Sequence, residues 1–310
     1  MAPTIALTGA TGFIGGTVLA WLIGAGYRVR ALVRPASLYK CRHLPAAVEW
    51  ISGDCTEDAS VRLLLTGADA AVHCAGVVRG ATPNAFNRVN VDGTACLVQN
   101  AAALANNAKI LLLSSLAARE PRLSPYAASK LAGEEALRHH GGDFFWGIFR
   151  PAAVYGPGDR ELLPFFQAMF RGVAPVIGLP SNRVSMLHVD DLAAAILAWL
   201  RSPGPNHGVY EVHDGHSQGY SWREIIDIVA SCRGKRVVRM PVPVSLLQFL
   251  AQLNLAVARL SGRAPMLTPW KVQELLHNDW VADNAALEAA TGWRPTVSLA
   301  AGIRQTMGLA

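Results

Sequence analysis

The sequence predicts an α/β fold, with a doubly wound parallel sheet followed by a smaller, mainly helical C-terminal domain. Short apolar runs alternate with segments of helical periodicity in the first half of the chain, which is the order that a parallel sheet requires. A glycine-rich turn joins the first run to the first helical segment. The alternation loosens after residue 157, so we expect one domain over 1–157 and another over 158–310. The helix predicted over 188–200 and the strand near 208–214 are expected to return to the first domain.

The composition is that of a folded protein. Hydrophobic residues make up 51% and charged residues 16% of the 310 residues, which excludes disorder. The net charge of +6 comes from basic residues scattered along the chain, so we expect weak attraction for anionic ligands and no nucleic-acid partner. Five cysteines without a CxxC pair argue against disulfides and a metal site, and favour a cytoplasmic location. No signal peptide is expected, because no basic residue precedes the first apolar run.

The turn Thr8–Gly15, with the sequence TGATGFIG, lies between an apolar run and a helical segment. Gly9 permits the tight turn, Gly12 lets a pyrophosphate approach the backbone, and Gly15 lets helix and strand pack closely. The helix N-terminus then offers N–H groups and a positive dipole end to phosphates. We therefore predict a dinucleotide site formed by Gly9, Thr11, Gly12, Phe13, Ile14 and Gly15.

The next apolar runs predict which nucleotide is bound. The second run ends in Arg34, where a dinucleotide fold meets the adenosine ribose. An arginine there would pair with a 2′-phosphate, so we predict NADP(H) rather than NAD(H). Asp54, after the third run, is expected to accept the adenine amino group, with capping of the following helix as the alternative. Ala75 and Gly76 end the fourth run and leave room for the cofactor to cross the sheet edge.

Tyr126 and Lys130 form the candidate catalytic pair, because residues four apart on a helix share a face. An ammonium beside a phenol would lower the pKa of the phenol from about 10. The phenol could then exchange a proton with an alcohol or carbonyl while a nicotinamide exchanges hydride. Ser115, at the end of the fifth run, can hydrogen-bond the same oxygen. Asn90, in a helix expected over 87–105, needs polar partners if it is buried.

Two further motifs, NVDGT at 90–94 and RPAAVYGP at 150–157, lie before and after Ser115, Tyr126 and Lys130 in the chain. With them the chain resembles the extended short-chain dehydrogenase/reductases, the NAD(P)-dependent epimerase/dehydratase group. The match runs nearly end to end. It implies a Rossmann-type dinucleotide-binding domain over 1–157 and a mostly substrate-binding domain over 158–310.

The resemblance also implies a role for each site residue. Tyr126 would be the acid/base, and Lys130 would tune it and bind the nicotinamide ribose. Ser115 would orient the reacting oxygen. Asn90 would lie near the cofactor, and the segment from Pro151 to Val154 would pass near the nicotinamide. Dimers are common among such proteins, so a homodimer is an expectation.

Differences between this sequence and the usual motifs of the family limit the reactions that the protein is expected to catalyse. Ala153 stands where many enzymes acting on sugar nucleotides carry an asparagine that holds the diphosphate, and Leu116 and Ala117 replace the acidic pair of dehydratases. The residues of the motifs at 113–118 and 150–157 look more like those of the 3β-hydroxysteroid dehydrogenase and dihydroflavonol reductase branch. We therefore predict an NADP(H)-dependent oxidoreductase that interconverts a secondary alcohol and a ketone on an apolar, non-nucleotide substrate.

Two alternatives remain open. The first is an NAD(P)-dependent nucleotide-sugar epimerase or reductase, in which another group such as Arg183 holds the pyrophosphate. The second is a non-catalytic, cofactor-bound scaffold, which the intact Ser115, Tyr126 and Lys130 disfavour.

The segment 243–260 is very apolar but is judged too short and too polar to span a membrane. We expect it to pack within the second domain. The alternative is a wall or lid over an apolar substrate that touches a membrane surface.

Overall fold

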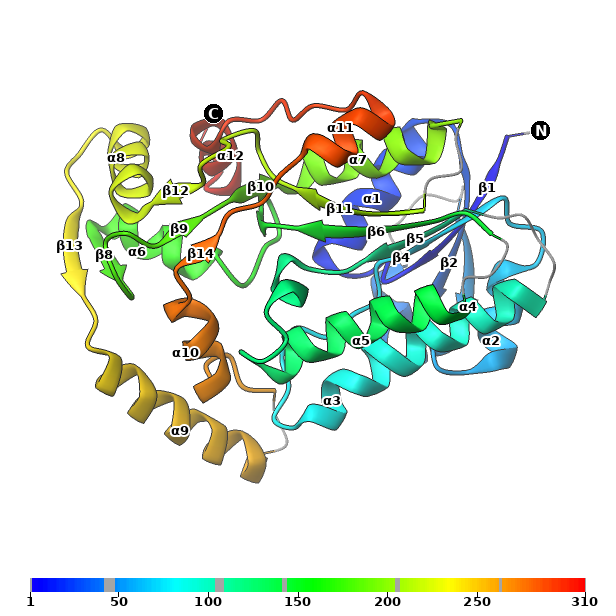
Figure 1. The fold of residues 1–310 in the computed structure, drawn as a ribbon, viewed down its shortest axis with the longest axis horizontal. Helices are drawn as coiled ribbons and strands as arrows, with labels where there is room; N and C mark the ends of the chain where they lie inside the picture. Colours follow the sequence, from blue (N-terminus) through cyan, green and yellow to red (C-terminus); the bar gives the residue numbers. More distant parts are fainter. Residues whose placement is uncertain are drawn as a thin grey trace.

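A parallel sheet forms the centre of the protein in a computed structural model that describes residues 2–41, 48–103, 109–140, 144–203, 207–261 and 264–309. Its strands are, in chain order, β1 (Thr4–Thr8), β2 (Arg28–Val33), β3 (Val48–Ser52), β4 (Ala70–His73), β5 (Lys109–Leu113), β6 (Trp146–Pro151) and β11 (Gly208–Val212). They form a seven-stranded sheet in the order β11-β6-β5-β4-β1-β2-β3, and every pair is parallel (Figure 1). The predicted fold class is confirmed.

Helices cover both faces of this sheet (Figure 1). One face carries α1 (Phe13–Gly24), α7 (Val189–Arg201) and α11 (Ala285–Thr291), and the other carries α2 (Asp58–Leu65), α4 (Gly93–Ala103) and α5 (Pro125–His140). Side chains alternate between the two layers, so that Ile5 and Leu7 of β1 join the core under α1 and α7, whereas Ala6 joins the other core. A sheet covered on both faces explains why its strands are continuous apolar runs rather than alternating ones.

The helix predicted over 87–105 has a different construction. A short helix, α3 (Pro83–Asn87), begins earlier, after Thr82, whose hydroxyl accepts a hydrogen bond from the Ala85 N–H. A π-helical turn over Arg88–Asp92 then leads into α4. The prediction of one regular helix beginning at 87 was therefore wrong, because residues that widen a helical turn leave no mark in the apolar periodicity.

The rest of the second half of the chain forms a separate layer of small sheets and helices around its own hydrophobic core. Its strands are β7 (Ala153–Tyr155), β8 (Val173–Val176), β9 (Arg183–Val184), β10 (Met186–His188), β12 (Tyr220–Ser221), β13 (Val238–Pro241) and β14 (Asp279–Trp280). They pair as the small sheets β10-β7, β12-β9-β14 and β13-β8. The helices are α6 (Leu163–Arg171), α8 (Trp222–Arg233), α9 (Val244–Ser261), α10 (Pro269–Leu276) and α12 (Leu299–Thr306). The division into domains at residue 157 stays a prediction.

Helix α9 packs through one face only. Leu247, Ala251, Leu255 and Ala258 are buried, and the first two share a small core with Val272 of α10. By length and composition, with a mean hydropathy of 1.3, α9 is the one helix among the described residues that could cross a membrane. The segment was expected to be too short and too polar for this; its length and composition fall within the range of spanning helices, whereas its packing on α10 is that of a helix attached to the rest of the protein.

Candidate active site

The carboxyl ends of β1, β4, β5 and β6 lie at one edge of the sheet, because parallel strands all end on the same side. This edge brings together the glycine turn, the 74–80 loop, Ser115 and Pro151, which are far apart in the sequence. Pro151 is the last residue of β6, and Val154 lies half-buried in β7, paired in register with Leu187 of β10. The candidate site is built at this edge.

The glycine turn leaves no room for side chains. Gly9 has φ +74°, and a Cβ there would lie 2.7 Å from backbone atoms of Cys74 and Ala75. A Cβ on Gly15 would lie 2.2 Å from the carbonyl oxygen of Gly9. Gly12 begins α1, whose first turn has no acidic residue, and no described side chain caps it. The free N–H groups at this N-terminus fit the diphosphate of a dinucleotide.

A buried hydrogen-bond chain supports the turn from below. The Thr8 hydroxyl accepts a hydrogen bond from the Ala75 N–H at 3.0 Å and lies 2.9 Å from Nδ1 of His73. Burial lowers the pKa of His73 to about 3, so this histidine is neutral at physiological pH. The chain ties the end of β1 to the end of β4 beneath the predicted cofactor site.

At the predicted adenosine end, Arg34 is exposed directly after β2. Asp54 accepts hydrogen bonds from the N–H and hydroxyl of Thr56 at 3.1 and 2.9 Å. Burial alone would raise the pKa of Asp54, but those bonds and the charges of Arg88 and Arg34 lower it. Helix α2 begins after Glu57, so Asp54 does not cap it. The capping alternative was therefore wrong, and the adenine contact stays a prediction.

Asn90 is buried and has the polar partners that its burial requires. Its side-chain N–H groups donate to the Val77 carbonyl at 3.1 Å and to the Ser129 hydroxyl at 2.8 Å, and its Oδ1 accepts from the Val77 N–H at 2.9 Å. The π-helical turn thus joins the 74–80 loop to helix α5. A Cβ on Gly133 of α5 would lie 2.3 Å from the Asn90 carbonyl oxygen, so the helix needs glycine where it crosses this turn.

Ser115 and Tyr126 meet at the start of α5. The Ser115 hydroxyl accepts a hydrogen bond from the Ala117 N–H at 3.2 Å, and it also hydrogen-bonds the Tyr126 phenol. Burial raises the pKa of Tyr126 to about 12, and the charges of Glu274 and Glu161 add to this, whereas the Ser115 hydrogen bond lowers it. The predicted lowering of this pKa was therefore wrong for the ligand-free protein.

Lys130 has a backbone partner next to the candidate site. Its buried ammonium donates a hydrogen bond to the Leu113 carbonyl at 2.9 Å, and burial lowers its pKa to about 8. A Cβ on Gly76 would lie 3.0 Å from the ammonium nitrogen and 3.3 Å from Oδ1 of Asn90. Lys130, Asn90 and Gly76 therefore lie close together at the sheet edge, and the contact of Lys130 with a nicotinamide ribose stays a prediction.

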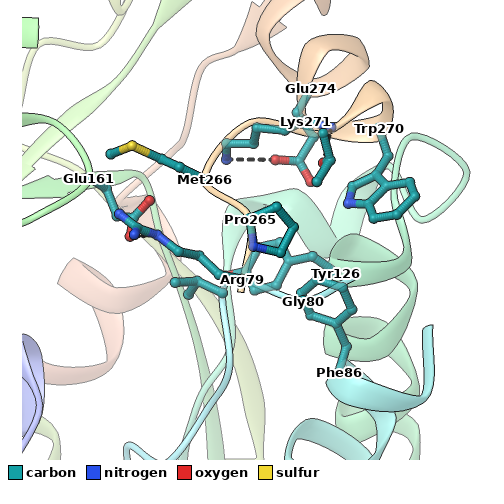
Figure 2. Close-up of a pocket in the computed structure, with 12 residues that line it drawn as sticks. Arg79, Gly80, Phe86, Tyr126, Glu161, Pro265, Met266, Trp270, Lys271 and Glu274 are labelled. Carbon is teal, nitrogen blue, oxygen red and sulfur yellow. Dashed lines mark hydrogen bonds and ion pairs between the residues drawn. The ribbon is translucent and has the colours of Figure 1, made fainter. Parts of the chain in front are cut away.

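Tyr126 also lines a pocket that sequence reasoning missed (Figure 2). Its apolar lining residues are Val78, Phe86, Pro265, Met266 and Trp270. Its polar side chains are Arg79, Glu161, Thr268, Lys271 and Glu274. These residues come from loops, from α3 and from α10, and no sequence motif marks them. The alternative of a wall formed by 243–260 is not found in this pocket, whose wall is formed by Pro265, Met266 and α10 after that segment.

Two ion pairs lie in the pocket. Arg79 Nε donates to Glu161 at 2.7 Å, which links the 74–80 loop to the second half of the chain. Lys271 Nζ donates to Glu274 at 2.8 Å, the pair joined by a dashed line in Figure 2. Glu274 is buried and also accepts a hydrogen bond from the hydroxyl of Ser124, which caps α5 beside Tyr126. The charged pair Lys271 and Glu274 is thus linked through Ser124 to α5, the helix that carries the candidate acid Tyr126.

Two further observations limit the chemistry. Arg183 donates to the Gly219 carbonyl at 3.1 Å and to Glu224 at 3.3 Å, and it is not among the described residues that line the pocket. In the part of the chain that the structure describes, no group of three or more His, Cys, Asp or Glu side chains could hold a metal ion.

This geometry agrees with the comparisons with known proteins. Residues 5–212 match the model of the NAD dependent epimerase/dehydratase family, and the chain belongs to this family. It is therefore an NAD(P)-dependent enzyme of the extended short-chain dehydrogenase/reductase type, which confirms the resemblance seen in its motifs.

Its relatives include both reductases and epimerases. The chain is 40% identical over 287 residues to the ceramide reductase of Caulobacter vibrioides, covering 91% of this chain and 87% of the relative. It is 26% identical over 337 residues to the UDP-glucose 4-epimerase of Vibrio cholerae, covering 99% and 95%. A solved structure of UDP-glucuronic acid 4-epimerase from Bacillus cereus, in complex with UDP-glucuronic acid and NAD, superposes with a TM-score of 0.74. That superposition covers 98% of each chain at 20% identity, and it shows the shared fold.

Proposed function

We propose that this protein is an NADP(H)-dependent reductase that converts a ketone to a secondary alcohol on a ceramide-like lipid, a long-chain amide. The observation that carries the proposal is the position of the Tyr126 phenol in a pocket with an apolar wall and an ion-paired end. An apolar wall suits a hydrocarbon chain, and Lys271 and Glu274 offer a donor and an acceptor to an amide or hydroxyl head. The 40% identity to a ceramide reductase supports the same substrate class.

The protonation state of Tyr126 favours reduction. A phenol with a pKa of about 12 carries its proton at neutral pH, so it is ready to donate to a carbonyl oxygen. Ser115 donates or accepts at the same oxygen and orients it. When bound, the cofactor supplies the hydride that reaches the carbonyl carbon. The proton from Tyr126 completes the alcohol.

The cofactor preference rests on charge at the adenosine end. Arg34 and Arg88 both act on Asp54, so two guanidinium groups lie near the place where a 2′-phosphate would bind. Arginine pairs with phosphate through two parallel hydrogen bonds, whereas a ribose hydroxyl needs an acceptor. This arrangement favours NADP(H) over NAD(H).

The test is turnover of a short-chain, water-dispersible ceramide with an oxo group at carbon 3, followed by NADPH oxidation. We expect the wild-type protein to form the alcohol and Tyr126→Phe to lose about 10²–10⁴-fold in kcat while binding NADPH as before. Tyr39→Phe is the matched control, because Tyr39 is 63% exposed on the 3₁₀ helix Pro35–Cys41, and it should behave as wild type. Turnover by Tyr126→Phe at the wild-type rate would refute the assignment of the acid.

The second candidate is a nucleotide-sugar epimerase, favoured by the full-length similarity to the Vibrio cholerae enzyme. The position of Arg183, which is not among the described residues that line the Tyr126 pocket, weighs against it. Melting temperatures with saturating NADP⁺ separate the candidates, because a ligand that binds the native state raises them. A rise with UDP, dTDP or GDP, together with no turnover of the oxo-ceramide, would replace our proposal with this one.

A further inference from the structure

Helix α9 exposes a continuous apolar stripe on the face opposite its packed one. Phe249 is 65% exposed, Leu253 53% and Leu260 90%. The stripe consists of Leu246, Phe249, Leu250, Leu253, Val257 and Leu260. Apart from the neighbours Phe249 and Leu250, successive positions are three or four residues apart, so they lie along one side of the helix. A stripe of this size on a soluble surface marks an interaction site.

The chain around α9 carries the positive charge of the protein. Residues 228–273 contain seven basic residues and no aspartate or glutamate, a charge above the +6 of the whole chain. The rest of the chain is therefore slightly negative. The neighbouring acidic residues are Asp227, beside Arg236 and Arg239, and Glu274, paired with Lys271. The basic residues are scattered along the sequence, as expected, but the net positive charge is concentrated here because this segment has no acidic residues.

Basic and apolar groups occupy the same outer edge of the molecule. Strand β13 leads into α9, and its Val238, Arg239 and Met240 are all exposed. Arg236 precedes this strand and is exposed, as is Arg259 near the end of α9. Figure 1 shows β13 and α9 following one another along the side of the protein opposite the N-terminus.

We infer that β13 and α9 form a docking surface for an anionic lipid bilayer. A helix that lies in the interface buries its apolar face at the boundary between headgroups and acyl chains, while basic residues beside it bind lipid phosphates. The observed stripe and the flanking arginines have this arrangement. A second copy of the chain fits less well, because two such edges would bring like charges together. The helix lies on the bilayer rather than crossing it, since its other face packs on α10.

The docking surface adjoins the pocket. The segment that follows α9 supplies Pro265 and Met266 to the pocket wall, and Met266 is 45% exposed. A protein lying on its α9 face would hold the mouth of the pocket near the membrane, so that a lipid could enter without crossing water. This last step rests on the proposed function, whereas the docking itself does not.

Vesicle flotation of the full-length protein, without substrate or cofactor, tests the inference. We expect strong binding to phosphatidylcholine vesicles that contain about 30% phosphatidylglycerol, weak binding to pure phosphatidylcholine, and release of the protein at high salt. Equal binding to both vesicles, or binding to neither, would overturn it.

Paired variants locate the surface. Phe249→Glu/Leu253→Glu should lose at least about tenfold in vesicle affinity, because two apolar anchors are replaced by charges. Leu63→Glu on α2 is the matched control, since Leu63 is 54% exposed and lies far from α9 in the fold. It should bind as wild type, and both proteins should melt at the wild-type temperature. An equal loss in the control, or none in the double variant, contradicts the inference.

Charge variants and activity complete the design. Arg236→Ala/Arg239→Ala should lose about tenfold in affinity for anionic vesicles and nothing on neutral ones, whereas the control Arg62→Ala should lose no affinity.

A wild-type dimer that the Phe249→Glu/Leu253→Glu change converts to monomers, without vesicle binding, would identify a second copy as the occupant and overturn the inference. Vesicle binding without ketone reduction would refute only the proposed function. Reduction of the short-chain ketone without vesicle binding would refute only the docking.

Discussion

The glycine-rich edge of the sheet and the pocket beside Tyr126 are built in opposite ways. At the edge, close backbone approach decides the geometry, because Gly9 and Gly15 leave less than 3 Å for any added Cβ. In the pocket, side chains decide it, through the Arg79–Glu161 and Lys271–Glu274 pairs. The edge is assembled from one turn and the strand ends beside it. The pocket joins loops that are nearly 200 residues apart. Sites made by backbone are therefore far less tolerant of substitution than sites made by side chains.

The largest effect is expected from a substitution that disrupts the close contact between backbone segments at the glycine turn. Gly15→Ala would place a Cβ 2.2 Å from the Gly9 carbonyl oxygen, so we expect a loss of about 3 kcal/mol in the free energy of unfolding. NADPH binding should also be lost. Gly16→Ala is the neighbouring control, because its Cβ would lie 3.5 Å from the nearest atom, an ordinary contact. Urea unfolding and cofactor titration measure both, and equal stability of the two variants would contradict the comparison.

A smaller effect is expected where the edge uses a side chain. Arg34→Ala should reduce the preference for NADPH over NADH by about tenfold, the usual size for removing one charged hydrogen-bonding partner. Arg28→Ala, at the exposed start of the same strand, should leave that preference unchanged. The measurement is the ratio of the dissociation constants of the two cofactors. An unchanged ratio in Arg34→Ala would remove the basis for the NADP(H) proposal.

The smallest effect concerns the charges of the pocket. The negative charge of Glu274 disfavours the phenolate, so Glu274→Gln should lower the pKa of Tyr126 from about 12. The alkaline limb of the pH–rate profile for reduction should therefore move to lower pH, because removing a negative charge favours the phenolate. Glu161→Gln should move it less, and the distant Glu288→Gln not at all. A shift to higher pH would contradict the geometry.

Much of the cofactor edge could be predicted from the sequence. The glycine turn, Asn90, Ser115 and the pair Tyr126 and Lys130 each follow an apolar run or share a helical spacing. Their elements lie at one edge, as a parallel sheet requires. The errors arose where local pattern carries no information. The π-helical turn under Asn90 does not alter the apolar periodicity, and burial is the largest influence on the pKa of Tyr126, which it raises.

By itself, the sequence determined the fold class, the family and the cofactor cradle, because strand–turn–helix geometry and missing side chains are local properties of the chain. Only the tertiary structure decided the shape of the pocket, since its wall at 265–274 reaches Tyr126 through packing of α10 against the start of α5. It also decided which face of α9 is covered and which stays open. The reason is that burial and long-range charge depend on neighbours in space, which apolar periodicity along the chain does not specify.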